Sequence, residues 1–394
     1  MLTLGGRGMG QGGLRIAYVH YGWQSGVTSA VARALADRGH ELQLVAATGA
    51  LELRDPVSRR PRPRPDVLRN LALAIARFGR QGPEHRWNTG YAFDRHARDA
   101  GSALRAVRPA PDLVLQNGAL FGPGVPPPFP YVLLVDYTRA LAEASPGWPE
   151  AGVSTPLRYG PGWFAREGAV YQGAAAIAAF SDNAARSVVS DYGADPGRVR
   201  VVGAGANVFP ETAPRRDDGH TIAFVGFDFA RKGGLVLLEA LRILRGRIPR
   251  ARLLVAGAPA PARVPPGATF LGRVDIAELP ALLSQATVFA LPTLQEPFGL
   301  AFLDAMACGL PCVGTRIEAV PEIVREGETG LLVPPGDPVA LAAALERVLA
   351  DPGRARAMGA RGRARVFASG LWSHVAARLE RTFTDVLGSS GRAA

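Results

Sequence analysis

The feature that most constrains the fold is a repeated alternation of short apolar runs with segments of helical length. In the first half of the chain, the runs cover residues 14–22, 41–47, 112–118, 131–138, 175–181 and 199–205. They are apolar at both parities, and helical segments such as 27–39 separate them. This pattern is typical of a parallel β-sheet that helices cover on both sides.

This alternation of apolar runs and helical segments stops once and then resumes, which divides the chain in two. Residues 206–220 are polar and contain proline, as linkers do. Further apolar runs follow at 220–226, 251–257, 268–274, 287–293, 310–316 and 330–336. We therefore expect an α/β protein with two doubly wound, Rossmann-like domains, at 14–209 and 218–370, after a disordered leader at 1–13. Ligands of this architecture bind in a cleft at the carboxyl ends of the strands.

The chain is strongly basic, with 45 Lys and Arg residues, 34 Asp and Glu residues and a net charge of +11. The arginines are spread over the whole length, which argues against nucleic-acid binding. The densest basic run, SRRPRPRPD at 58–66, predicts a solvated loop that attracts phosphates or anionic lipid headgroups. No apolar stretch is long enough to span a membrane. Cys308 and Cys312 lack disulfide or metal-site spacing, so we expect two small buried side chains.

The most informative stretch is residues 296–338, in which we expect a helix over 298–307. The start of such a helix offers backbone amides without intrahelical partners, which make an anion site. These are the amides of Phe298, Gly299 and Leu300. Glu296 before the helix and Asp304 two turns into it are placed to accept hydrogen bonds from hydroxyl groups. A phosphate flanked by two such carboxylates describes a sugar nucleotide, with one carboxylate for the sugar and one for the ribose.

From Glu296 onward, the chain resembles the retaining glycosyltransferases of family 4, which have the GT-B fold and a Glu-x7-Glu motif in this helix. The resemblance spans most of the chain. It also covers residues 38–42, 180–193, 230–234 and 372–383. It implies a donor site held mainly by the second domain, and a C-terminal helix, within 371–394, that crosses back to the first domain.

The resemblance also implies a role for each matching position. Lys232 would neutralise the departing diphosphate oxygens, and Glu296 would face the hydroxyls of the donor sugar. Asp136 falls where many members carry a histidine or aspartate that projects toward the reacting sugar; the alternative is a strand-end aspartate that caps a turn. The other matching positions, Gly226 among them, would bind the nucleotide sugar. Its phosphates or sugar would lie at Gly26, Phe298, Gly299 and Leu300, its base at Arg273 and Val274, and its ribose at Asp304.

The chain departs from the family pattern at the same site. Asp304 replaces a glutamate and is shorter by one methylene. The family commonly has Gly-Arg after the first strand of the second domain, whereas here Gly226 is followed by Phe227. Arg231 is the candidate to supply the missing charge from a shifted position. The family's Asn-Gly-Val-Asp near the linker reads Ala-Gly-Ala-Asn at 204–207.

Lys232 is the only lysine in the chain, since every other basic residue is arginine. Lysine supplies a compact point charge, whereas arginine supplies a wide planar fork. Sugar transfer develops negative charge on a diphosphate, and a fixed cation there lowers the barrier. The alternative is an ordinary lysine at a helix start. No Asp-x-Asp pair occurs in a loop expected to face the cleft, so we predict no metal requirement.

The sequence therefore predicts a metal-independent, retaining glycosyltransferase that moves a hexose-type sugar from a UDP or GDP donor to an acceptor hydroxyl, with no other cofactor. A saccharide or lipid-linked acceptor for the cell envelope would bind within residues 51–171. We expect a cytoplasmic protein, with peripheral contact to an anionic membrane as a further hypothesis. Two alternatives remain: a degenerate GT-B protein that is a non-catalytic sugar-nucleotide binding partner, and a sugar-nucleotide epimerase.

Overall fold

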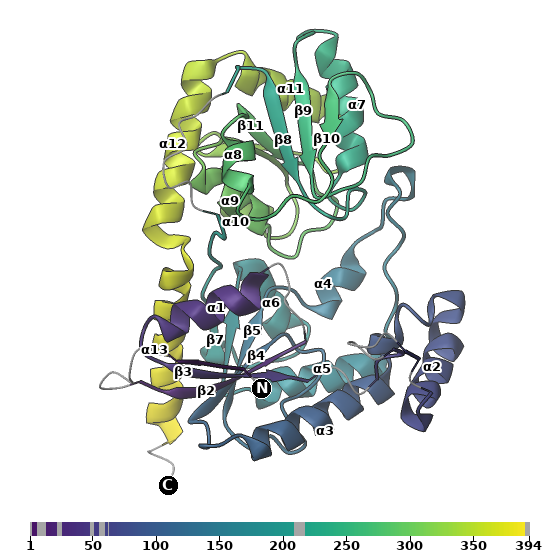
Figure 1. Cartoon of the computed structure of the whole chain (residues 1–394), viewed down its shortest axis with the longest axis vertical. Helices are drawn as coiled ribbons and strands as arrows, with labels where there is room; N and C mark the ends of the chain where they lie inside the picture. Colours follow the sequence, from purple (N-terminus) through teal and green to yellow (C-terminus); the bar gives the residue numbers. More distant parts are fainter. Residues whose placement is uncertain are drawn as a thin grey trace.

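The computed structural model describes residues 2–5, 13–21, 26–47, 51–54, 60–61, 63–208 and 217–390. It contains one β-sheet in each half of the chain, one above the other along the long axis of the molecule (Figure 1). The first sheet has seven strands in the order β1-β3-β2-β4-β5-β6-β7, and only the edge pair β1–β3 is antiparallel. The strands are β1 (Leu2–Gly5), β2 (Arg15–His20), β3 (Glu41–Ala46), β4 (Leu113–Asn117), β5 (Tyr131–Val135), β6 (Ala176–Ala179) and β7 (Val199–Val201).

Strand β1 corrects the prediction of a disordered leader at 1–13. Residues Leu2–Gly5 pair with β3, from Leu2 opposite Leu44 to Gly5 opposite Glu41. The segment is too short and too rich in flanking glycine to carry a strand signal of its own. It forms a strand because the unpaired edge of β3 supplies the hydrogen-bonding partners. Residues 1 and 6–12 of the leader lie outside the described residues.

The second sheet has six strands, all parallel, in the order β10-β9-β8-β11-β12-β13. The strands are β8 (Thr221–Val225), β9 (Arg252–Ala256), β10 (Ala268–Phe270), β11 (Val288–Leu291), β12 (Cys312–Thr315) and β13 (Gly330–Val333). Numbered within the domain, this order is 3-2-1-4-5-6, the order of a Rossmann sheet. Every apolar run in the sequence contains one of the observed strands, so the prediction of two doubly wound domains is confirmed.

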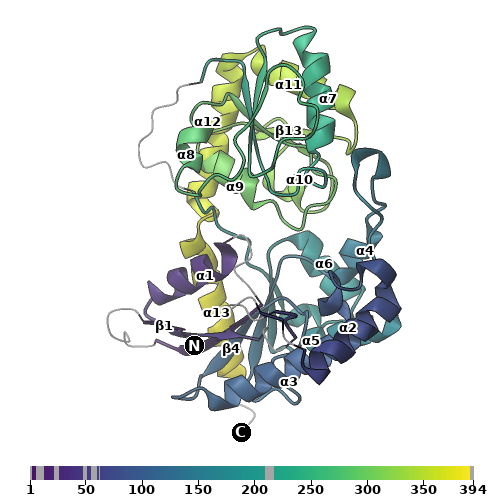
Figure 2. The same ribbon diagram turned by 45° about the vertical axis from the view of Figure 1, so that its right-hand side comes forward.

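Helices cover the faces of both sheets (Figures 1 and 2). Those of the first domain are α1 (Val27–Ala36), α2 (Pro65–Phe78), α3 (Gly90–Ala106), α4 (Arg139–Ala144), α5 (Pro161–Gly173) and α6 (Asp182–Ser190). Those that follow β8 are α7 (Gly234–Arg245), α8 (Leu279–Leu283), α9 (Leu300–Ala307), α10 (Val320–Ile323), α11 (Pro338–Leu349), α12 (Pro352–Ser369) and α13 (Trp372–Ser390). Helices α12 and α13 run along one side of both domains, and α13 packs against α1 and β6.

Burial explains the sequence pattern. Every residue of β4, β5, β6, β11, β12 and β13 is buried, which is why these runs are apolar at both parities. Cys308 and Cys312 are free and buried, as predicted. Among the described helices, none combines the length and the apolar character that crossing a membrane requires.

A second connection between the domains is a strap at residues 145–156, which leaves α4 and reaches up beside α7 (Figures 1 and 2). Trp148 and Val153 form an isolated antiparallel bridge within the strap. A Cβ atom on Gly336 of the second domain would lie 2.7 Å from the Trp148 ring. A Cβ atom on Gly152 would lie 3.7 Å from the Leu235 side chain of α7. The strap therefore packs directly against the second domain.

Candidate functional site

The carboxyl ends of β8, β9 and β10 are lined by three glycines, Gly226, Gly257 and Gly272. The Gly257 N–H donates to the Gly272 carbonyl oxygen (2.7 Å), and a Cβ atom on Gly257 would lie only 2.8 Å from the Gly226 oxygen. Side chains would fill this edge of the sheet. The strand order reverses between β8 and β11, the place where ligands bind in open α/β sheets.

Lys232 and Glu296 meet across this reversal point. Lys232 lies in the turn between β8 and α7, Glu296 follows β11, and the Lys232 Nζ donates to Glu296 Oε2. The side chain of Glu296 is 4% exposed and therefore buried, whereas that of Lys232 is 16% exposed. The Lys232 stem passes over Gly226, where a Cβ atom would lie 3.2 Å from Cγ.

The two loops that carry this pair are locked together by the backbone. Gly233, the residue before α7, has φ +74°, and a Cβ atom there would lie 1.8 Å from the Pro292 carbonyl oxygen. The Leu294 N–H donates to the Arg231 oxygen (2.8 Å). Only glycine at position 233 permits this approach, which places Lys232 against the loop of Glu296.

Arg231 adds a second cation beside the pair. Its Nη1 donates to the carbonyl oxygen of Gln295 (2.7 Å), and its Nε donates to Asp228 Oδ2 (3.2 Å). Phe227, which occupies the position of the family's arginine, is 71% exposed. The structure thus brings the guanidinium of Arg231 to the loop that holds Glu296.

Asp136 reaches the same region from the first domain. It follows β5 and lies near enough to Glu296 for the two carboxylates to repel each other. Burial, with that repulsion as a smaller contribution, raises the pKa of Asp136 to about 6. Hydrogen bonds from its own amide and that of Tyr137 act in the opposite direction. Asp136 therefore gains or loses a proton in the mildly acidic range.

Glu318, Tyr137 and Gln295 complete the site, and sequence reasoning did not assign them a role in it. The Tyr137 hydroxyl donates to Glu318 Oε1, and the Glu296 N–H donates to Glu318 Oε2. Gln295 Nε2 lies 3.4 Å from the Tyr137 oxygen. Burial raises the pKa of Glu318, and burial with the Glu318 charge holds the pKa of Tyr137 well above its usual range. No spacing in the sequence links Tyr137 to a residue of the other domain.

Asp304 lies against the linker rather than beside Glu296. Its Oδ1 accepts hydrogen bonds from the N–H groups of Asn207 (2.6 Å) and Val208 (3.1 Å). The residue is 8% exposed, and burial raises its pKa to about 7 although these two hydrogen bonds act against the rise. Gly26, at the start of α1 with φ +81°, faces the same Asn207 side chain. Gly26 and Asp304 are thus neighbours through the linker.

Helix α9 begins at Leu300, two residues later than expected. Gly299 precedes it with φ +112°, so the first-turn amides belong to Leu300 and the residues after it. Phe298 turns away, because its ring packs on Phe180 of the first domain at 5.5 Å between centroids. It lines a hollow of about 280 Å³ on the side of α12 and α13. The structure therefore places the Phe298 side chain apart from Lys232 and Glu296.

The two positions expected near the base follow β10. Arg273 is exposed and Val274 packs partly against the core. Both come directly after Gly272, which Gly257 joins to the glycine-lined edge. A Cβ atom on Gly272 would meet nothing within 4 Å, so this end of the edge is open.

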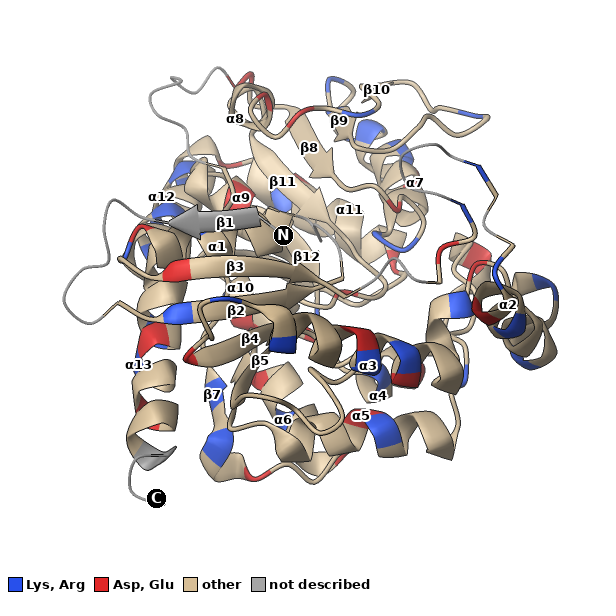
Figure 3. Cartoon of the chain, turned by 60° about the horizontal axis from the view of Figure 1, so that its bottom comes forward, with Lys and Arg blue, Asp and Glu red and all other residues tan. Residues whose placement is uncertain are grey.

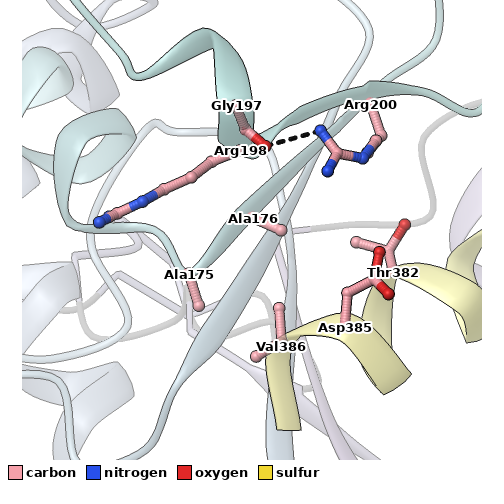
Figure 4. Close-up of a pocket in the computed structure, with 8 residues that line it drawn as sticks. All are labelled: Ala175, Ala176, Gly197, Arg198, Arg200, Thr382, Asp385 and Val386. Atoms are coloured by element: carbon pink, nitrogen blue, oxygen red, sulfur yellow. Dashed lines mark hydrogen bonds between the residues drawn. The ribbon is translucent and has the colours of Figure 1, made fainter. Parts of the chain in front are cut away.

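A further hollow, of about 500 Å³, lies in the first domain at the amino-terminal ends of strands β6 and β7 (Figure 4). It is lined by the starts of β6 and β7 and by Thr382, Asp385 and Val386 of α13. Arg200 Nη1 donates to the Gly197 oxygen (2.7 Å) at its rim. It contains none of the predicted site residues. Among the described residues, no group of three or more His, Cys, Asp or Glu is placed to hold a metal ion.

Sequence comparison finds a family match within the second domain. Residues 219–351 match the family model of the group 1 glycosyl transferases. The chain is 35% identical over 244 residues to D-inositol 3-phosphate glycosyltransferase of Salinispora tropica, a match that covers 53% of this chain and 49% of the relative. The chain thus spans about half the length of the curated relatives it matches.

Solved structures resemble nearly the whole chain. Sucrose-phosphate synthase from Thermosynechococcus elongatus has a TM-score of 0.70 at 23% identity, covering 95% of this chain and 100% of that one. HepE from Anabaena, in complex with UDP-glucose, has a TM-score of 0.65 at 14% identity, covering 94% and 100%. The fold is that of the GT-B glycosyltransferases, as expected.

Proposed function

We propose that this protein is a retaining glycosyltransferase that moves a hexose-type sugar from UDP or GDP to an acceptor hydroxyl. The observation that carries the proposal is the ion pair between partly exposed Lys232 and buried Glu296 at the reversal point of the second sheet. Its donor class is supported by the group 1 glycosyl transferase match at 219–351 and by HepE, whose structure holds UDP-glucose. The proposal extends to the whole chain what these matches support for parts of it.

In this mechanism, the ammonium of Lys232 leaves Glu296 for the diphosphate and neutralises charge as the sugar–phosphate bond breaks. Glu296 then accepts hydrogen bonds from the sugar hydroxyls. Arg231 raises the positive potential of the same loop, so side-chain cations do the work that a divalent ion does in other transferases. The acceptor hydroxyl attacks on the face that the diphosphate leaves, and the leaving phosphate takes its proton. The configuration at the anomeric carbon is retained without a side-chain nucleophile.

The rest of the nucleotide would bind along the glycine-lined ends of β8, β9 and β10. Gly226, with no side chain, leaves room for the diphosphate next to Lys232. The base would lie against the backbone of Arg273 and Val274. The phosphates would also approach Gly26 at the start of α1 and the amides of Gly299 and Leu300. Asp304 has one oxygen occupied by the linker, so only Oδ2 would reach the ribose.

The alternative is a non-catalytic sugar-nucleotide binding partner, which Phe227 and Asp304 favour. Arg231 weakens that alternative, because it returns a cation to the site from four residues further on. Donor hydrolysis without acceptor, or transfer to any hydroxyl, rules it out. A change in the stereochemistry of a UDP sugar with no acceptor present would instead identify an epimerase.

The first test is calorimetry of UDP, GDP, ADP and their common hexose conjugates with the wild-type chain and with Lys232→Ala. Loss of one charge-assisted hydrogen bond costs about 1.5–3 kcal/mol, so affinity should fall by about 10- to 100-fold. Arg347→Ala, an exposed cation on α11, is the control for the change in net charge and should leave affinity unaltered. Absence of binding to every nucleotide sugar refutes the proposal. For the donor that binds, NMR of the product then reports the anomeric configuration.

We also propose that the protein is cytoplasmic and contacts an anionic membrane through α2, where a lipid-linked cell-envelope acceptor would be presented. Helix α2 projects from the first domain, with arginines on and around it (Figure 3). Its inner face is held by Val67, Asn70 and Ala74. Leu68 (53% exposed) and Ile75 (47%), two turns apart, expose one apolar face of the helix, and Leu73 (42%) is exposed on another side.

Charge complements this apolar face. The exposed arginines on or beside the helix are Arg60, Arg64, Arg69, Arg77 and Arg80. Asp66, the acidic residue in its first turn, is already paired with Arg95 (3.0 Å). An apolar strip bordered by arginine fits a surface that combines acyl chains with negative headgroups.

Sedimentation with lipid vesicles tests the membrane contact. The wild-type chain should sediment with phosphatidylserine-containing vesicles and not with neutral ones. The double change Leu68→Ser and Ile75→Ser should abolish this, whereas Val339→Ser, at a still more exposed valine on α11 (61%), should not. Equal sedimentation with both vesicle types contradicts the proposal.

A further inference from the structure

Glu318 has an unusual backbone conformation. Its φ is +47°, and among the described residues it is the one non-glycine residue with positive φ. A side chain in this left-handed region crowds its own backbone, which glycine avoids. A strained residue of this kind persists only where surrounding contacts hold it, and such residues gather at functional sites. The question is which contacts make a glutamate preferable here.

Both oxygens of Glu318 accept a hydrogen bond, one from each domain. Oε1 accepts from the hydroxyl of Tyr137, which follows β5 of the first domain. Oε2 accepts from the backbone N–H of Glu296 in the second domain. Because Tyr137 keeps its proton, as its raised pKa requires, it is the donor in the contact between domains. A glycine at position 318 would leave the Glu296 amide without this acceptor.

The Glu296 backbone decides where the Glu296 carboxylate points. The carboxylate is paired with Lys232 on one side, while the amide is held by Glu318 on the other. Gln295, the preceding residue, contacts Tyr137 and the Ala142 carbonyl of the first domain, both at 3.4 Å. The loop that carries Glu296 is thus held by first-domain groups directly at Gln295 and, through Glu318, at Glu296.

We propose that Glu318 is a positioning residue that orients Glu296 only while the two domains are closed on each other. The inference rests on the proposed function, since orientation of Glu296 matters for sugar transfer. Tyr137 moves with the first domain and donates a hydrogen bond to Glu318, which in turn accepts one from the Glu296 amide. The Glu296 carboxylate therefore faces the sugar in the correct direction only when Tyr137 is in place. Closure and catalytic competence are then coupled through one side chain.

The chain offers a matched control four residues further on. Glu322 also bridges the domains, because its two oxygens accept from the N–H groups of Asp182 and Asn183 at the start of α6, both at 2.8 Å. None of its hydrogen bonds involves Glu296. Glu318→Gln and Glu322→Gln therefore make the same chemical change in two interdomain contacts, only one of which touches the Glu296 loop.

Kinetics with the full chain and its best donor give the first test. We expect kcat for transfer to fall about tenfold in Tyr137→Phe and in Glu318→Gln, with the donor KM within about twofold of wild type. The double variant should be no slower than the worse single variant, because both break one chain of contacts. Glu322→Gln should keep kcat within about twofold. A fall in kcat of equal size in Glu322→Gln, or additive effects in the double variant, overturns the proposal.

Hydrogen–deuterium exchange gives a second test that needs no activity. The amide of Glu296 should exchange about tenfold faster in Tyr137→Phe and Glu318→Gln, and at the wild-type rate in Glu322→Gln. Unchanged exchange in Tyr137→Phe overturns the coupling, whatever the kinetics show. If the wild-type chain transfers no sugar at all, the proposed function fails, while the exchange data still decide whether Glu318 holds Glu296.

Discussion

Replacing Asp304 with asparagine should stabilise the protein, and increasingly so as the pH rises. The Asp304 side chain is buried under the linker, where one oxygen accepts hydrogen bonds from the amides of Asn207 and Val208. Asparagine has nearly the same shape and keeps an oxygen to accept them. The difference is that asparagine never has to carry a charge in this buried place.

The magnitude follows from the pKa. Burial raises the pKa of Asp304 from 3.8 to about 7. Because the folded protein holds this proton more tightly than the unfolded chain, the associated stability is complete below about pH 3.8 and is lost as the pH rises through about 7. A difference of roughly three pKa units corresponds to about 4 kcal/mol of unfolding free energy. The asparagine variant escapes this loss, so its advantage over wild type should grow by about 4 kcal/mol between about pH 4 and pH 8.

The assay is the thermal midpoint of both proteins across that range. For a domain of this size, 4 kcal/mol corresponds to a change of about 10 °C in the difference between the two midpoints. Repeating the series in about 1 M salt, where the Debye length is about 3 Å, removes the contribution of surface charges and should leave the trend in place. A midpoint difference that is the same at low and high pH refutes the reasoning. It would mean that Asp304 is ionised at neutral pH, with its charge compensated in a way these contacts do not supply.

Other perturbations test the rest of the site. Gly233→Ala should cost roughly 3 kcal/mol or more, since the added Cβ meets the Pro292 oxygen, whereas Gly309→Ala, with a matching φ of +75° and open space, should cost about 1 kcal/mol; thermal midpoints compare them. Transfer should slow as the pH falls below about 6, because Asp136 then takes up a proton, and Asp136→Asn should remove that inflection from the pH–rate profile. An inflection that survives the change assigns it to another group. Both cysteines are buried, so a thiol reagent should label them only after unfolding, and rapid labelling of the native protein contradicts the core packing.

Much of the fold could be predicted because burial on both faces restricts a strand to apolar residue types, which the local sequence shows. A central parallel strand is covered on both faces, so every residue of β5 or β11 is apolar, and the run is visible without any partner. Strand β1 was missed for the opposite reason, because it depends on pairing with the edge of β3 and not on its own residues.

In the candidate site, too, some residues could be predicted from the sequence, whereas their contacts could not. Lys232 is the only lysine and Glu296 opens a long motif, so the sequence alone predicts both as site residues. Asp304 belonged to the same motif, yet its Oδ1 was found on the linker, because one methylene fewer and the path of residues 207–208 decide what it reaches.

The sequence by itself determined the two doubly wound domains and the identities of the charged groups in the second, since these depend on residue type and on spacing along the chain. Only the tertiary structure decided that Tyr137 meets Glu318, 181 residues away, and that Glu318 holds the Glu296 amide. The physical reason is that a hydrogen bond between domains is made by the way two separately folded sheets dock, and no periodicity within either sheet encodes that docking.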